Sequence, residues 1–101
     1  MDLTYLKEHI CEELSDALEY ATHAIELKPM APTWGKMFID MAAAELTHAS
    51  NLYKMFVEYY QKISASYSET PDYVEEMYKE VCRCYSRDSA QAKIIIDMYS
   101  R

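Results

Sequence analysis

The chain has 101 residues, one Gly, three Pro and a formal net charge of −7. This length predicts a single domain over residues 1–101, and so few Gly and Pro residues exclude the many turns of a β-sheet protein, which favours an all-α helical bundle. The excess of acidic residues argues against binding of duplex nucleic acid through a basic surface.

The three Cys residues are an odd number, and the N-terminal residues do not have the pattern of a signal peptide. Both observations favour a reducing compartment, so we expect a cytoplasmic protein. The longest apolar run, at residues 94–96, is far shorter than the roughly 20 residues that a membrane-spanning helix needs. We therefore expect no membrane association.

The first predicted helix covers residues 3–27, with Asp2 as its N-terminal cap. Its inward face is predicted to carry apolar residues and one acid, namely Leu6, Ile10, Glu13, Ala17, Ala21 or Tyr20, and Ala24. Residues 1–27 contain seven acidic residues and only one basic residue. The acidic surface of this helix has three possible interpretations: a solvated surface, a cation-binding surface, or a mimic of a nucleic-acid backbone.

The two Pro residues at positions 29 and 32 end the first helix and predict a short connection. A second helix, capped by Thr33, is then expected to run antiparallel to the first as far as about Lys62. One stripe of this helix is predicted to face the core; its residues are Trp34, Phe38, Met41, Glu45, His48, Leu52, Met55 and Tyr59.

Two residues of that stripe, Glu45 and His48, are polar and three positions apart, so both side chains can reach one atom. Counted outward from the connection, Glu13 of the first helix lies at nearly the same height. The three side chains are candidate metal ligands, and His9 could add a fourth ligand or a supporting hydrogen bond. The alternative is a cluster of polar side chains that hydrogen-bond to one another.

The third predicted helix covers residues 71–99, with Thr70 as its cap and Pro71 at its first position. It is either one helix or two, because Asp88 interrupts the apolar stripe and could cap a second helix. Cys82 and Cys84 are about 200° apart on a helix and therefore cannot act together as a metal or redox pair.

Two sequence segments resemble the ferritin-like superfamily. They are residues 11–21, CEELSDALEYA, and residues 41–49, MAAAELTHA. The similarity is greatest to its small members, the rubrerythrin-type and encapsulated-ferritin-type proteins and the short ferritin-like proteins of bacteria and phages. This resemblance implies a ferritin-like bundle in which Glu13, Glu45 and His48 bind iron, with manganese or zinc as alternatives.

A complete ferritin-like site has a second Glu and a second Glu-x-x-His pair, but residues 71–101 contain no His. The resemblance therefore implies a half-site that is completed in a homodimer or a higher homo-oligomer. If no second half-site forms, the sequence favours a different function. The chain would then be a non-enzymatic module that binds another protein through its acidic first helix, such as a phage-encoded regulator or inhibitor.

Overall fold

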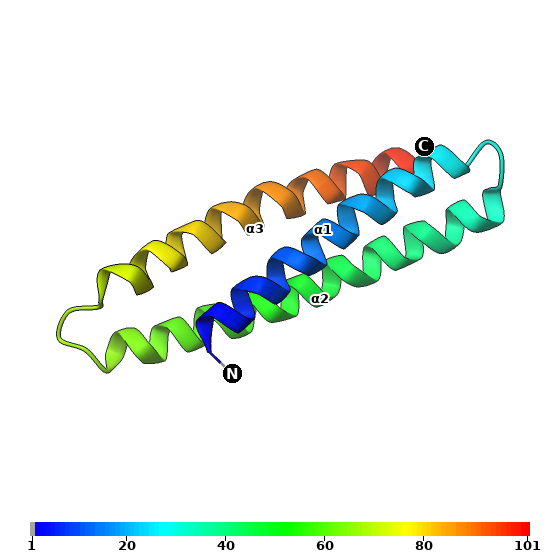
Figure 1. Cartoon of the computed structure of the whole chain (residues 1–101). Coiled ribbons are helices and arrows are strands. Elements are labelled where there is room, and N and C mark those ends of the chain that lie inside the picture. The colour runs from blue at the N-terminus through cyan, green and yellow to red at the C-terminus, as the bar shows by residue number, and fades with distance from the viewer. Residues whose placement is uncertain (1) are drawn as a thin grey trace.

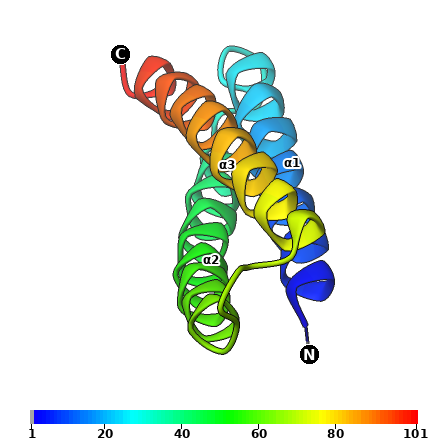
Figure 2. The ribbon, with the colours of Figure 1, turned by 90° about the vertical axis from the view of Figure 1, so that its left-hand side faces the viewer.

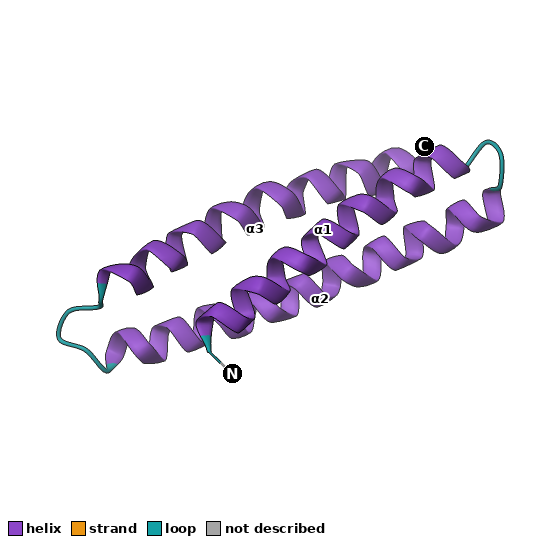
Figure 3. Ribbon diagram, viewed as in Figure 1, coloured by secondary structure: helices purple, strands orange, loops and turns teal. Residues whose placement is uncertain are grey.

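The computed structural model describes residues 2–101 as three long helices: α1 (Leu3–Leu27), α2 (Pro32–Ala65) and α3 (Asp72–Tyr99) (Figures 1 and 3). The all-α prediction is confirmed, as are the antiparallel α1–α2 hairpin and the long third helix. Each helix packs against the other two, and the bundle measures 58 × 21 × 15 Å (Figures 1 and 2). Within residues 2–101, no helix has a stretch long and apolar enough to cross a membrane.

The helix starts match the sequence signals in part. The predicted cap of α1 is confirmed, because the backbone N–H of Tyr5 donates to Asp2 Oδ1 at 2.9 Å. The predicted caps Thr33 and Thr70 are wrong, since α2 and α3 begin without a side-chain cap bond. The residues at the N-cap positions are Ala31 and Pro71, and neither has a side-chain oxygen that could accept a hydrogen bond from the first turn. Thr70 Oγ1 instead lies 2.8 Å from Ser64 Oγ in the α2–α3 connection.

Near the α1–α2 connection, the core is lined mainly by small side chains. We call this the alanine half; its buried residues are Ala21, Ala24, Ile39 and Ala42. At the connection itself, a Cβ added to Gly35 would lie 3.2 Å from the carbonyl oxygen of Ala24 and 3.3 Å from the backbone nitrogen of Lys28. Small residues at these positions therefore let the backbones of α1 and α2 approach closely.

Toward the other end of the bundle, large side chains from all three helices form the core. We call this the large-residue half; its buried residues are Leu3, Leu6, Ile10, Leu14, Ala49, Phe56, Val74 and Val81. Tyrosine rings close the gap between α2 and α3, where Tyr53 stacks on Tyr85 at 4.1 Å and Tyr60 stacks on Tyr78 at 3.9 Å. These half-buried rings account for much of the unusual tyrosine content, since a Tyr side chain has an apolar body and a polar tip.

The predicted core stripe of α2 is wrong for several of its residues. Trp34, Met41 and Met55 are 64%, 43% and 41% exposed, and the other apolar members are only half-buried. The fully buried positions lie further round the helix, at Gly35, Ile39, Ala42, Ala49 and Phe56. The predicted core-facing side of α2 is wrong because α1 packs against the small residues of α2. A hydrophobic pattern alone does not show that small residues are preferred at such a helix contact.

The helix α3 is continuous through Asp88, so of the two alternatives the single helix is observed, and Asp88 does not cap a second helix. Asp88 is half-buried and accepts hydrogen bonds from Arg87 Nε at 2.9 Å and from Cys84 Sγ at 3.4 Å. The Arg87 guanidinium holds the pKa of this carboxyl below its usual range. With its charge paired in this way, Asp88 fits into an uninterrupted helix.

Candidate metal centre

The packing of α1 against α2 brings three predicted site residues together. Glu13 lies near the middle of α1, and Glu45 and His48 lie one turn apart on α2. His48 Nδ1 is 3.7 Å from Glu13 Oε2 and 3.8 Å from Glu45 Oε1. One ligand atom from each residue lies within 4.8 Å of the other two. The predicted proximity of these three side chains is therefore confirmed.

The three side chains differ in their exposure to solvent. The side chains of Glu13 and Glu45 are each 23% exposed, whereas that of His48 is 55% exposed. The expectation that His48 points into the core is therefore wrong. It lies on the edge of α2 next to α1, so the trio forms a shallow, half-buried site at the surface of the bundle.

One carboxylate oxygen of Glu13 has no hydrogen-bond partner. Glu13 Oε2 is inaccessible to solvent, and Nδ1 of the His48 ring lies 3.7 Å from it. Hydrogen bonds between nitrogen and oxygen are about 2.7–3.2 Å long, so His48 Nδ1 does not form a hydrogen bond with Glu13 Oε2. A buried and unpaired carboxylate oxygen is costly, and a cation would offset that cost.

The separations fit a shared metal ion with small side-chain rotations. Two ligand atoms about 2.1 Å from one ion, at a tetrahedral angle, lie about 3.4 Å apart. The distances from His48 Nδ1 to the two carboxylate oxygens, 3.7 and 3.8 Å, are only slightly longer, and the third pair of ligand atoms lies within 4.8 Å. Across residues 2–101, these are the only three His, Cys, Asp or Glu side chains grouped this closely. Two carboxylates and one imidazole suit iron, manganese or zinc.

The other two histidines lie outside the trio. The His9 ring lies tilted against the Tyr5 ring, with ring centroids 4.3 Å apart, and His9 is not part of the group, so it does not add the possible fourth ligand. His23 lies 3.8 Å from Glu19 and 3.5 Å from Glu26 on the exposed side of α1. The His23 side chain is 48% exposed.

Two cysteine contacts were not predicted from the sequence. Cys11 Sγ of α1 lies 3.9 Å from Cys84 Sγ of α3. Burial, with hydrogen bonds to Asp88 and Cys11, raises the pKa of the Cys84 thiol to about 12. Cys82 points elsewhere and accepts a hydrogen bond from the Tyr53 hydroxyl at 3.3 Å. The prediction that Cys82 and Cys84 face different directions is thus confirmed, and only the register of α1 against α3 could have revealed the Cys11 contact.

Comparison with known proteins adds no relative. No family model matches the chain, and neither a curated protein nor a solved structure is similar to it. The ferritin-like resemblance therefore stays a prediction that depends on the two short motifs in α1 and α2.

Proposed function

We propose that this chain binds a first-row transition-metal ion, with iron as the first candidate and manganese or zinc as the alternatives. Glu13, Glu45 and His48 are the ligands. The observation that carries the proposal is the convergence of these three side chains around a carboxylate oxygen that is buried and has no hydrogen-bond partner. Three ligands do not complete the coordination shell of these metals, and we propose that a second copy of the chain supplies the rest.

The proposal can be tested by metal titration of the full chain under anaerobic conditions. Fe²⁺, Mn²⁺ and Zn²⁺ are each added to the metal-free protein, and the bound ion is measured by calorimetry and elemental analysis. Replacement of one ligand in a metal site lowers affinity strongly, so Glu13→Gln and His48→Ala should each weaken binding by at least about tenfold. Glu13→Gln preserves the shape of the side chain and removes only its charge.

The chain provides a matched control for this titration. His23 also lies between two glutamates, but on the exposed side of α1, where no buried oxygen is left unpaired. We expect His23→Ala to bind metal as the wild-type protein does. If His48→Ala and His23→Ala lose affinity equally, or if the wild-type protein binds none of the three ions, the metal-binding proposal is wrong.

The exposed acids of α1 favour a second candidate function, which is recognition of a protein partner with a basic surface. Glu12 and Glu19 are exposed, and Asp16 between them is half-buried. Reversal of these three charges should abolish binding of such a partner, while His48→Ala should leave it intact. A complex that survives the charge reversal would exclude this surface, and a complex lost in His48→Ala would instead implicate the trio.

A further inference from the structure

Two free thiols from different helices face each other between α1 and α3. Cys11 Sγ of α1 lies 3.9 Å from Cys84 Sγ of α3. Both residues are half-buried, so packing holds them in place while a small molecule can still reach them. A disulfide bond is about 2.05 Å long, so each sulfur would have to move by roughly 1 Å to form one. A modest rotation about each Cα–Cβ bond provides this movement.

Two further contacts hold α1 and α3 in the register that keeps these sulfurs together. One turn before the two cysteines, Lys7 Nζ donates to Glu80 Oε2 at 3.0 Å. At the far end of both helices, Lys28 Nζ donates to the backbone carbonyl oxygen of Arg101 at 3.3 Å. In all three contacts the two residues are 73 positions apart, so α1 and α3 run parallel in one register. The sulfur contact is therefore a regular part of this helix interface.

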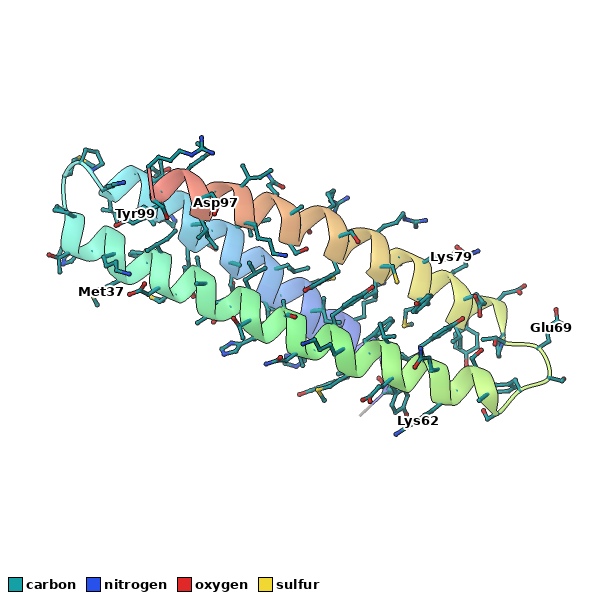
Figure 4. All side chains as sticks on the ribbon, turned by 180° about the vertical axis from the view of Figure 1, so that it is seen from behind. Met37, Lys62, Glu69, Lys79, Asp97 and Tyr99 are labelled. Atoms are coloured by element: carbon teal, nitrogen blue, oxygen red, sulfur yellow. The ribbon has the colours of Figure 1, made fainter. Side chains whose placement is uncertain are left out.

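The position of Cys84 on α3 directs its sulfur into the bundle. Figure 4 shows Lys79 on α3 pointing away from the other two helices. Cys84, five positions later, lies about 140° round the helix from Lys79 and faces the bundle. Its thiol donates a hydrogen bond to Asp88 Oδ2 at 3.4 Å. In the contact with Cys11, Cys84 is therefore the acceptor, and a lone pair of its sulfur points at the other sulfur.

Among the described residues, the two sulfurs lack the further ligands that a metal site needs. Within residues 2–101, neither Cys11 nor Cys84 belongs to a group of three closely spaced potential metal ligands. The neighbouring Asp88 carboxylate is already paired with Arg87 Nε at 2.9 Å. Two adjacent thiols without a third ligand favour oxidation to a disulfide instead. Such disulfides are mostly transient in reducing compartments and respond to oxidants.

We propose that Cys11 and Cys84 are a site of reversible oxidation, at which a hydroperoxide causes α1 and α3 to be joined by a disulfide bond. First, one oxygen atom passes from the hydroperoxide to Cys11, which becomes a sulfenic acid, and the peroxide leaves as water or an alcohol. The Cys84 sulfur then attacks the Cys11 sulfur. The S–O bond breaks, and the hydroxide leaves as water with the Cys84 proton. Two electrons thus pass from the thiols to the peroxide, and a dithiol reductant reverses the change.

The order of the two sulfurs follows from their surroundings. Burial raises the pKa of the Cys84 thiol to about 12, so this sulfur stays protonated near neutral pH and an oxidant attacks it slowly. The first oxidation therefore falls on Cys11. Once Cys11 is a sulfenic acid, the second step needs no diffusion, because the Cys84 sulfur is already beside it.

The disulfide closes a covalent ring from residue 11 to residue 84, which contains all of α2 and both connections. A cross-link that closes a long loop restricts the unfolded chain strongly, so oxidation should raise the Tm by roughly 10 °C. It also fixes α3 to the α1–α2 hairpin. This inference goes beyond the proposed metal binding and does not depend on it, because Glu13 lies about 200° round α1 from Cys11.

The test uses the reduced full chain in EDTA, treated with a small excess of hydrogen peroxide. We expect two of the three free thiols to disappear. Tryptic mapping without reductant locates the link, because trypsin cuts at Arg83, between Cys82 and Cys84. Residues 8–36 should be linked to residues 84–87. A link to residues 80–83, a link between two chains, or oxidation without any link would overturn the proposal.

Thermal unfolding of the same samples gives a second measurement. The oxidised chain should show the higher Tm, and dithiothreitol should return it to the starting value. This reversal separates the disulfide from methionine oxidation, because dithiothreitol is not the enzyme that reduces a sulfoxide. A Tm that does not change on formation of the link would show that the link does not constrain the bundle, and the proposed joining of α1 to α3 would be wrong.

Substitutions provide matched controls. Cys11→Ser and Cys84→Ser should each abolish the link and the Tm shift. Cys82→Ser removes the thiol that accepts the Tyr53 hydrogen bond, and it should cross-link as the wild type does. The double variant Cys11→Ser/Glu12→Cys moves the α1 thiol about 100° round the helix to an exposed position, so no link should form. If this double variant cross-links as fast as the wild type, the register of α1 and α3 does not bring the sulfurs together, and the proposal is wrong.

Discussion

The two halves of the bundle are held together in different ways. In the large-residue half, Leu6, Ile10, Leu14 and Phe56 are fully buried, so burial of large apolar side chains supplies the stability. In the alanine half, the fully buried positions are alanines, and the gain comes from close approach of two helix backbones. On α2, Glu45 and His48 lie between Ala42 of the alanine half and Ala49 of the large-residue half. These two residues of the polar trio thus lie where one mode of packing gives way to the other.

The largest effect is expected in the large-residue half. Phe56 is its largest fully buried side chain, and Phe56→Ala should lower the free energy of unfolding by about 3–5 kcal/mol because it leaves a cavity. Chemical denaturation monitored by circular dichroism measures this change. Ile94→Ala, which alters an exposed side chain on α3, should stay within about 0.5 kcal/mol of the wild type. Similar costs for the two variants would show that Phe56 is not a core anchor.

The alanine half should respond to added volume instead of lost volume. Ala42 is fully buried, whereas its neighbour Ala43 is exposed. Ala42→Leu should therefore cost about 1–3 kcal/mol, because the α1 and α2 backbones must separate to admit the side chain. Ala43→Leu makes the same chemical change outside the core and serves as the control in the same denaturation experiment. If both variants are equally stable, the two helices are not in close contact here.

The fold was largely predictable from local signals. The boundaries of α1 followed from Asp2 and the first proline, and the antiparallel hairpin followed from the short connection. The height match of Glu13 with Glu45 and His48 needed only the helical rise and this hairpin, so it was predictable too. The continuity of α3 was not, since the hydrogen bonds that pair Asp88 with Arg87 and Cys84 appear only when the side chains are placed.

The core face of α2 illustrates what periodicity leaves open. The helix carries two stripes, one of large residues with coiled-coil spacing and one containing Gly35, Ile39 and several alanines. The sequence pattern predicts that the stripe of large residues faces the core, because this stripe is the more hydrophobic of the two. The chain packs the other stripe against α1, since small residues permit the closest approach. His48 belongs to the stripe of large residues, whose members are half-buried or exposed, and it is one of the exposed ones.

The smallest predicted effect is a fall in the free energy of unfolding at alkaline pH. It arises in the large-residue half and not in the alanine half. Cys84 borders the large-residue core, and its pKa is raised by burial to about 12, whereas an unfolded cysteine titrates near about 8.5. The folded state thus retains a proton that the unfolded state loses, so this contribution to stability is complete below about pH 8.5 and declines as the pH rises toward 12. The hydrogen bond to Cys82 raises the pKa of Tyr53 in the same direction, which extends the decline above about pH 10.

The test is the slope of unfolding free energy against pH between about 8.5 and 10, before unfolded tyrosines titrate. Cys84→Ala should flatten that slope, because the titrating thiol is gone. Ile96→Val, a small truncation beside the alanine half, should lower stability by the same amount at every pH and leave the slope unchanged. An unchanged slope in Cys84→Ala would mean that its thiol ionises as easily in the folded chain as in the unfolded one. Contacts with Cys11 and Asp88 would then be too loose to shield it, and α1 and α3 would pack less tightly in this half than their buried leucines and valines indicate.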